Sequence, residues 1–261
     1  MKNKRFLQND ITIENSENRI VISAHRGWSA QYPENTMIAY MAALEEDIDE
    51  IEIDVHLTKD EVPVLIHDST VDRTTDAAGL VNEFTFKNLK KLDAGSWKGE
   101  RFAGERVPAV EELFSYLRAF PGILLNVEIK QKTFETVDKT MWLIEQYGLW
   151  ERFVLTCFDA NIIQYAKETY GAKCQGFPSS KMDNFKFGPD GTYSHMYSVG
   201  VHDSLITREL REYFENCGIR FWTYCPDTDD MVKRHLAANS QLLTCNEIRP
   251  AIRILNEMGK R

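Results

Sequence analysis

Strand-like runs alternate with helix-like segments along most of this chain. Runs rich in apolar and β-branched residues predict nine strands, at residues 20–24, 50–55, 62–67, 124–129, 153–157, 173–177, 195–199, 220–224 and 241–244. Between most of them, apolar residues recur at helical spacing, as at Val110, Leu113 and Leu117 after Pro108. This alternation is typical of a mainly parallel sheet covered by helices.

One pair of predicted strands breaks the alternation. Only a few residues separate Val55 from Val62, whereas a parallel crossover needs about a dozen or more. The run after Val62 is therefore predicted to fold back as an antiparallel strand, with its turn at residues 59–61. We expect this hairpin to bring His67 roughly opposite Asp54.

Without the returning strand, the pattern contains eight strand–helix units. Eight such units are the number that closes a TIM (β/α)8 barrel. The predicted fold is therefore a single α/β barrel domain over residues 1–261, with a small insertion at about residues 57–107, after the second strand. We see no sequence typical of a linker that would separate a second domain.

Charge and composition narrow the function classes. The chain has 261 residues, 31 Lys and Arg, 40 Asp and Glu, and a formal net charge of −9. An acidic chain argues against nucleic-acid binding, which depends on many cationic contacts to phosphates. An anionic substrate would need a local group of cations.

Other features bear on the compartment. The N-terminal residues 1–20 begin with basic side chains but lack the apolar run of a signal peptide or membrane span, so we expect a cytoplasmic protein without stable membrane insertion. The five cysteines are widely spaced and form no CxxC pair. We expect reduced thiols rather than disulfides or a zinc cluster.

Three acidic residues lie on two predicted neighbouring strands. Glu52 and Asp54 share one face of their strand because side chains alternate with period two, and Glu128 lies on the next parallel strand. Their mutual repulsion favours one bound divalent cation, and all-oxygen ligands favour Mg²⁺ or Ca²⁺. The alternatives are protonation of at least one carboxylate and charge pairing with Arg26 and Lys130.

Two histidines flank these carboxylates. His25 ends the first strand and His67 comes from the hairpin, so two imidazoles are expected beside one metal. Such a pair suits general acid and base catalysis, each step contributing about 10²- to 10⁴-fold. Arg26 and Lys130 add the positive charge that a phosphate or phosphodiester requires.

Several segments together resemble the glycerophosphodiester phosphodiesterase family, over most of the chain from Val21 to about Pro250. The segments that carry this resemblance, in family order, are HRGWSAQYPENT, EIDVHLTKDEVPVLIHD with the following RTT, NVEIK and FWTY. The resemblance implies a TIM barrel and hydrolysis of glycerophosphodiesters to sn-glycerol 3-phosphate and an alcohol such as choline, ethanolamine or glycerol.

The resemblance also implies residue roles. It implies a divalent metal at Glu52, Asp54 and Glu128, with His25 and His67 as the acid and base. Further implied positions are the phosphate contacts Arg26 and Lys130, the rim-loop residues Glu34 and Asn35, and Trp222 as either a pocket residue or a core residue. The sequence leaves open which histidine is the acid. It also leaves open whether water or the glycerol 2-hydroxyl is the nucleophile.

The chain departs from the family pattern in three places. Asp60 and Glu61 replace the usual Asp-Gly turn; the stretch ANSQLLTCNEIRP replaces the usual sequence of the last strand; and Tyr224 and Cys225 follow Trp222-Thr223 in place of Val-Asn. Because the last two changes lie in late strands, they bear on the choice of alcohol more than on the chemistry.

The remaining histidines carry weaker expectations. His56 shares a face with Asp54 and is interpreted as a half-exposed strand residue rather than one that orients a metal ligand. His195 and His202 are predicted at the two ends of the strand before the FWTY segment, with His202 able to reach the rim. His235 is predicted on an amphipathic helix.

Three other functions remain to be weighed. A lysophospholipase D or phosphoinositide-type activity on the same scaffold predicts an apolar groove at the rim; the insertion offers Phe84, Phe86, Trp97 and Phe102, which we interpret as the core of a small subdomain. A non-catalytic barrel predicts loss of an acid, base or metal group, and none is missing. A two-carboxylate glycosidase would not need the basic residues around the carboxylates.

Overall fold

The computed structural model describes residues 19–261. The expectation of no signal or membrane segment concerns mainly residues outside this range. All nine predicted strands are present: β1 (Val21–His25), β2 (Glu50–Leu57), β3 (Pro63–Leu65), β4 (Leu124–Ile129), β5 (Phe153–Thr156), β6 (Cys174–Gly176), β7 (Ser198–His202), β8 (Arg220–Tyr224) and β9 (Leu242–Cys245).

Eight of these strands form a closed parallel barrel. The order is β1-β9-β8-β7-β6-β5-β4-β2, and β2 pairs again with β1. Strand β3 is antiparallel to β2. The predicted TIM barrel, with a hairpin after its second strand, is therefore confirmed.

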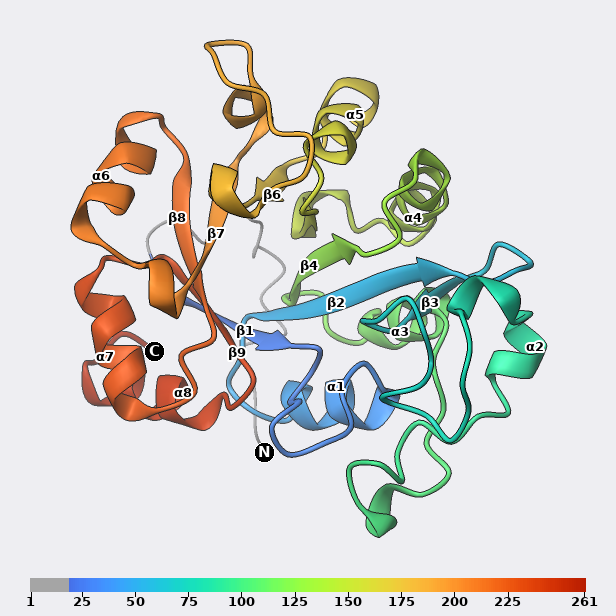
Figure 1. Cartoon of the computed structure of the whole chain (residues 1–261). Helices are drawn as coiled ribbons and strands as arrows, with labels where there is room; N and C mark the ends of the chain where they lie inside the picture. Colours follow the sequence, from blue (N-terminus) through green and yellow to red (C-terminus); the bar gives the residue numbers. More distant parts are fainter. Residues whose placement is uncertain (1–18) are drawn as a thin grey trace.

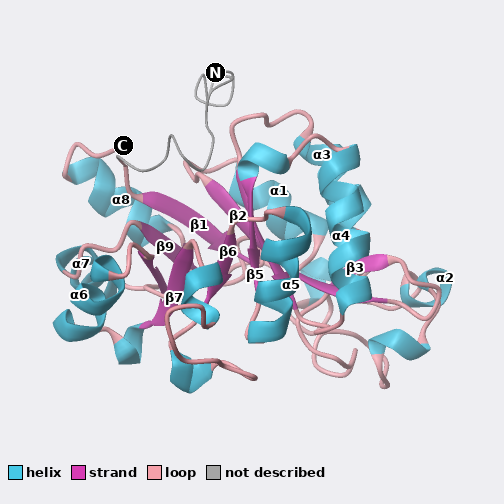
Figure 2. Ribbon diagram, turned by 90° about the horizontal axis from the view of Figure 1, so that it is seen from above, coloured by secondary structure: helices cyan, strands magenta, loops and turns pink. Residues whose placement is uncertain are grey.

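Helices surround the barrel (Figures 1 and 2). They are α1 (Met37–Leu44), α3 (Val110–Leu117), α4 (Phe134–Gln146), α5 (Ala160–Tyr170), α6 (Arg208–Asn216), α7 (Asp229–Ala237) and α8 (Arg249–Glu257), with the short α2 (Phe86–Leu89) in the insertion. The described chain between β6 and β7 has only 3₁₀ turns, Ser179–Lys181 and Thr192–His195, in place of an α-helix. This segment contains Pro178, Gly188 and Gly191 and lacks a helical apolar period.

Alternate residues along each strand point into the barrel and form layers. The lowest layer is an apolar cluster of Val21, Leu124, Val154, Trp222 and Leu242. The layer above is polar: Thr156 donates to Asn126 at 2.5 Å, and Asn126 donates to Gln175 at 3.3 Å. Most charged side chains on these inward faces lie toward the carboxyl ends of the strands. An exception is Glu50, which is buried beside Leu124 and whose pKa burial raises to about 8.

The hairpin uses an edge of β2 that β1 leaves free. The last β1–β2 pair is His25 with Glu52, and β3 then pairs with β2 from Val55 to Leu57. Its turn contains Glu61 at a φ of 60°. The insertion packs around a separate apolar cluster of Val64, Ile66, Val71, Val81, Leu89, Ala94 and Val107, with Phe84 and Phe86 against it. It lies on the side of the molecule opposite α6 and α7 (Figures 1 and 2).

The start of one strand corrects the sequence analysis, and the cysteines and helices complete it. Strand β7 begins at Ser198, three residues later than expected, so His195 lies in a 3₁₀ turn before it. All five cysteines are unpaired, as expected, and Cys157, Cys174 and Cys245 are buried. Among residues 19–261, no helix has both the length and the apolar character needed to cross a membrane.

A buried histidine ties α7 to the barrel. His235 is fully buried, its Nδ1 lies 2.7 Å from Thr223 Oγ1 on β8, and its Nε2 lies 2.8 Å from Asp203 Oδ1 after β7. Burial lowers the pKa of His235 and outweighs the opposing effect of Asp203. The folded state therefore favours the neutral form of the His235 ring.

This burial predicts a pH-dependent contribution to stability. His235→Gln should lower the free energy of unfolding at pH 7.5 by about 1 to 3 kcal/mol, because buried hydrogen-bonding groups lose partners. Since the unfolded state binds the proton more readily, the wild-type advantage should shrink as pH falls below about 6.5. Urea unfolding of both proteins between pH 5 and 8 measures the difference. A constant difference across that range would contradict the buried neutral histidine.

Candidate active site

The inward polar residues meet in a pocket at the carboxyl end of the barrel. Its volume is about 340 Å³, and the residues that line it include six that the sequence analysis selected: His25, Arg26, Glu52, His67, Glu128 and Lys130. Asp54 lies beside them and is fully buried. The carboxyl end is where side chains from parallel barrel strands converge.

The three predicted carboxylates are brought together by strand register. Asp54 on β2 pairs with Glu128 on β4, and Glu52 lies two residues before Asp54 on the same face. One ligand atom from each of the three lies within 4.8 Å of the others, and all three side chains are buried. Glu52 Oε1 and Asp54 Oδ1 have no hydrogen-bond partner among the described residues.

Two basic side chains lie beside the carboxylates. Lys130 Nζ is 2.5 Å from Glu128 Oε1 and 3.4 Å from Asp54 Oδ1, and Arg26 Nε is 3.0 Å from Asp54 Oδ2. The charge pairing considered as an alternative to a metal site is thus present. It leaves three acidic groups facing two basic ones, and Glu52 Oε1 has neither a hydrogen bond nor an ion pair among the described residues.

The carboxylates respond in opposite directions to this environment. Burial, Asp54 and Glu128 raise the pKa of Glu52 well above its ordinary value. Burial acts in the same direction on Asp54, but Lys130 and Arg26 outweigh it and hold the pKa of Asp54 below its usual range. Asp54 is therefore the stable anion of the cluster, and Glu52 is the group whose charge is least compensated.

A tight turn places Arg26 against the cluster. Arg26 and Gly27 have φ values of 57° and 77°. A Cβ on Gly27 would lie 2.7 Å from the backbone carbon of Ala39, so a side chain cannot fit there. The turn directs the Arg26 backbone N–H to Glu52 Oε2 at 2.8 Å.

His25 faces the carboxylates with one ring nitrogen. Its Nε2 lies 3.8 Å from Glu52 Oε2. Its Nδ1 lies 2.7 Å from Asn246 Oδ1 and 3.7 Å from Cys225 Sγ. Burial opposes protonation, but Cys225 and Asp54 outweigh it, so the pKa of His25 is raised.

A chain of ion pairs joins His67 to Arg26. His67 Nδ1 lies 2.6 Å from Asp68 Oδ1, and Arg73 Nε donates to Asp68 Oδ2 at 2.6 Å. Arg73 also donates to both oxygens of Glu34, which in turn accepts a hydrogen bond from Arg26 at 2.8 Å. Glu34 therefore aligns two arginines behind the pocket rather than lining it.

Two further predicted residues have supporting positions. Asn35 donates to Asp54 Oδ2 at 2.8 Å and accepts from the Tyr40 hydroxyl. His56 is buried rather than half-exposed, and its Nε2 donates to the carbonyl of His67 at 3.2 Å. It thus holds the hairpin that carries His67, while burial lowers the pKa of His56.

Trp222 lies in the core, below the pocket. It belongs to the apolar lowest layer of the barrel, only 5% exposed, whereas Tyr224 lies two residues further along the same face of β8 and lines the pocket. The residue of β8 that lines the pocket is therefore Tyr224, one layer above Trp222. The choice between core and pocket that the sequence left open falls on the core.

Aromatic rings line the wall away from the carboxylates. Phe158 and Phe177 stack, Phe177 meets Tyr224 edge-on at 6.0 Å between centroids, and Tyr224 meets His202 at 5.3 Å. His202 thus reaches the rim as the sequence allowed. Lys130 Nζ lies 5.7 Å from the centroid of Phe158, which joins this wall to the charged side.

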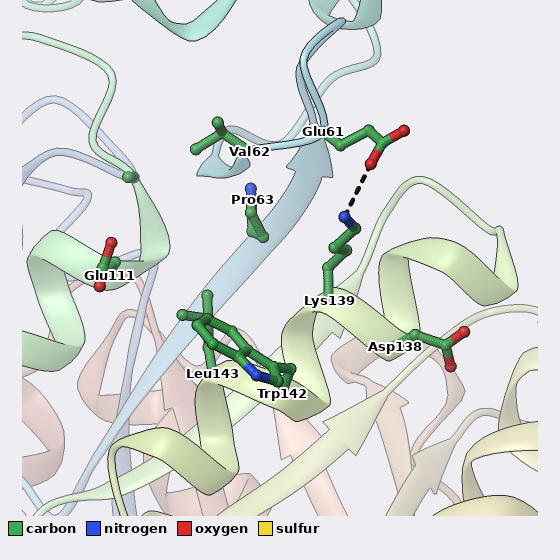
Figure 3. Close-up of a pocket in the computed structure, with 9 residues that line it drawn as sticks. Glu61, Val62, Pro63, Glu111, Asp138, Lys139, Trp142 and Leu143 are labelled. Carbon is green, nitrogen blue, oxygen red and sulfur yellow. Dashed lines mark hydrogen bonds and ion pairs between the residues drawn. The ribbon is translucent and has the colours of Figure 1, made fainter.

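A second pocket lies outside the barrel (Figure 3). It has a volume of about 560 Å³, between the hairpin turn and helices α3 and α4. Glu61 pairs with Lys139 across it at 2.8 Å, and Trp142 and Leu143 form an apolar side. It contains neither a histidine nor a cysteine, so the rim pocket is the candidate site.

Sequence reasoning missed several site residues. Asp68 and Arg73 lie inside segments that carry the family resemblance and could have been found there. Phe158 and Phe177 closely follow β5 and β6, where no local pattern marks them as pocket residues. Asn246 lies in the departing last-strand stretch, and its contact with His25 depends on closure of the barrel.

Comparison with known proteins relates more than half of this chain to one family. Residues 25–173 match the model of the glycerophosphoryl diester phosphodiesterase family. A glycerophosphodiester phosphodiesterase of Caldanaerobacter subterraneus is 43% identical over 153 residues, covering 58% of this chain and 63% of that protein. One from Bacillus altitudinis is 36% identical over 140 residues, covering 52% and 57%. The chain thus matches about three fifths of the length of these relatives.

Solved structures share the fold. A phosphodiesterase of Oleispira antarctica, solved with the product sn-glycerol-3-phosphate, has a TM-score of 0.80 at 23% identity, covering 92% of this chain and 98% of that one. A glycerophosphodiester phosphodiesterase of Agrobacterium tumefaciens has a TM-score of 0.75 at 23% identity, covering 89% and 98%. At this identity the likeness concerns the barrel fold.

The electrostatics of the carboxylates predict stability changes of opposite sign. In EDTA, Glu52→Gln should stabilise the protein by about 1 to 2 kcal/mol, because it removes a buried carboxyl group whose ionised form burial and its acidic neighbours disfavour. Asp54→Asn should destabilise it by about 3 to 5 kcal/mol, because Arg26 and Lys130 each lose the fully buried one of their carboxylate partners. Urea unfolding measures both, and changes of the same sign in the two variants would contradict this charge distribution.

Proposed function

Since the chain belongs to the glycerophosphoryl diester phosphodiesterase family, we propose that it is a metal-dependent hydrolase of glycerophosphodiesters, releasing sn-glycerol 3-phosphate and an alcohol. The observation that carries the proposal is one pocket that joins a buried carboxylate triad, two cations and two histidines. The product bound to the Oleispira antarctica relative supports the substrate class.

The acidic triad fits a divalent cation. Glu52, Asp54 and Glu128 supply only oxygen ligands, and Glu52 Oε1 and Asp54 Oδ1 lack hydrogen-bond partners among the described residues. Such a set suits Mg²⁺ or Ca²⁺. When bound, the cation would supply Lewis-acid stabilisation of charge on the phosphate. It would also relieve the repulsion that raises the pKa of Glu52.

Arg26 and Lys130 would hold the phosphodiester. Both line the pocket, and their charges are fixed: nearby carboxylates raise the pKa of each despite burial. Glu34 and Arg73 keep the guanidinium of Arg26 in place from behind. The aromatic wall of Phe158, Phe177 and Tyr224 would contact the carbon atoms of the substrate.

The two histidines would move the protons. One takes a proton from the nucleophile, and the other donates one to the oxygen of the departing alcohol. In each ring Nδ1 already has a partner, Asn246 for His25 and Asp68 for His67, so Nε2 is the nitrogen available to substrate. The nucleophile is either water or the glycerol 2-hydroxyl, and either histidine can serve as the base.

A small diester fits the pocket better than a lysophospholipid. The cavity of about 340 Å³ is at the lower end of the usual range for small-ligand sites. The insertion aromatics considered for lipid binding mostly pack inward, with Phe102 buried and Phe84 and Phe86 against the insertion core. A lipid chain would have to extend beyond this cavity.

Single substitutions of pocket residues should reduce turnover without unfolding the protein. His25→Ala, His67→Ala and Glu128→Ala should each reduce kcat by at least about a hundredfold, the scale of general acid–base catalysis. Circular dichroism should show a retained fold. Lys139→Ala, outside the pocket, is the control and should keep wild-type turnover. Ordinary turnover in any of the three pocket variants would count against these roles.

Metal removal tests the cofactor and the substrate together. Release of glycerol 3-phosphate from a panel of glycerophosphodiesters should stop in EDTA and return when excess Mg²⁺ or Ca²⁺ is added. A lysophospholipid is assayed in parallel by release of its head group. Full activity in EDTA would refute the metal requirement, and faster cleavage of the lysophospholipid would favour the lipid alternative.

A further inference from the structure

A hydrogen-bonded chain reaches His25 from the loops that follow β8 and β9. Asn246 Oδ1 lies 2.7 Å from His25 Nδ1. The amide nitrogen of Asn246 donates to Asp227 Oδ2, also at 2.7 Å. Neither Asn246 nor Asp227 lies in the segments that carry the family resemblance. Their contacts therefore add to the groups already described in the pocket.

Asp227 determines which way the Asn246 amide faces. Its Oδ1 accepts the backbone N–H groups of Asn246 and Glu247 at 2.7 and 2.9 Å, and its Oδ2 accepts the Asn246 side chain. A carboxylate accepts hydrogen bonds and has none to donate. The NH₂ group must therefore face Asp227, and the amide oxygen must face His25. Ser29 Oγ, a donor at 3.2 Å, meets the same oxygen.

This orientation determines the tautomer of His25. An amide oxygen only accepts, so His25 Nδ1 must carry a hydrogen whether the ring is neutral or protonated. The nitrogen that gains and loses the proton is then Nε2, which faces Glu52 at 3.8 Å. Cys225 Sγ also approaches Nδ1, but at 3.7 Å and as a weak acceptor.

We propose that Asn246 and Asp227 are positioning residues that hold His25 in the Nδ1–H tautomer, so that Nε2 exchanges protons with the substrate. The catalytic part of this inference rests on the proposed phosphodiesterase function. His67 has a charged counterpart, since its Nδ1 partner is the carboxylate of Asp68. The two imidazoles thus present the same nitrogen to the pocket through different acceptors.

An exchange of the two side chains tests the proposal. Asp227→Asn places an NH₂ group opposite the Asn246 NH₂ group, which favours rotation of the Asn246 amide and the wrong tautomer of His25. Asn246→Asp places two carboxylates face to face. The double variant Asp227→Asn/Asn246→Asp restores the side-chain pairings. The amide introduced at position 227 would donate to the carboxylate introduced at position 246, and that carboxylate would accept from His25 Nδ1.

Kinetics should follow this pattern. Each single variant should lower kcat about 10- to 100-fold, the usual effect of losing a residue that orients a catalytic group, with KM nearly unchanged. The double variant should recover most of kcat at its own pH optimum. Asn256→Asp, on the exposed surface of α8, is the matched control and should keep the wild-type kcat. Thermal unfolding monitors the fold of each variant.

A spectroscopic measurement tests the tautomer without any assay of activity. In ¹⁵N-histidine NMR spectra, with His25 assigned by comparison with His25→Gln, the wild type and double variant should show a protonated Nδ1, and Asp227→Asn should show a protonated Nε2. A protonated Nε2 and bare Nδ1 in the neutral wild-type ring would overturn the proposal, as would single variants with wild-type kcat or a folded double variant without recovery. If the wild type cleaves no glycerophosphodiester, the phosphodiesterase proposal fails, and the NMR result still decides the tautomer.

Discussion

Repulsion among three buried carboxylates is the constraint around which the rim of this barrel is organised. Asp54 is stabilised as an anion by Arg26 and Lys130, whereas Glu52 has a raised pKa and an unpartnered oxygen. Buried charges in such an arrangement are costly unless a counter-charge joins them. Neighbouring groups partly compensate this excess of negative charge. Glu34 and Arg73 hold Arg26 in place beside Asp54, and Asn35 donates a hydrogen bond to Asp54. The rim therefore holds an excess of buried negative charge at some cost to the stability of the chain alone, an arrangement that suits the proposed cation.

The sequence could predict the fold because its local and long-range signals agree. Period-two strands, helical apolar spacing and one impossibly short crossover together limit the topology to a barrel with a hairpin, and the structure has both. The connection between β6 and β7 differed because an α-helix there was inferred from the overall pattern rather than from its own residues. The predicted start of β7 is three residues too early because Met196 and Tyr197 continue the apolar run back from Ser198 to the 3₁₀ turn that ends at His195.

The pocket residues differ in how far the sequence alone can predict their positions. Glu52, Asp54 and Glu128 could be predicted because alternation along adjacent strands places them on one face. Trp222 could not be placed, since the same alternation allows either the buried layer or the rim, and the height within the barrel depends on strand stagger. Asn246 and Asp227 were beyond prediction, because the contact of Asn246 with His25 requires β9 to pair with β1 and close the barrel, and Asp227 acts only through Asn246.

Because the hairpin carries His67, the pocket combines residues from two separately packed parts of the fold, the barrel and the insertion. The carboxylates and His25 belong to the barrel wall, whereas His67, Asp68 and Arg73 belong to an insertion with a separate apolar cluster, joined to β2 by the three residue pairs of β3. A molecule whose insertion has not yet docked would have the acidic triad without its second imidazole. Under the proposed mechanism, full activity would therefore require a docked insertion, because the barrel supplies the acidic triad and His25 while the insertion supplies His67.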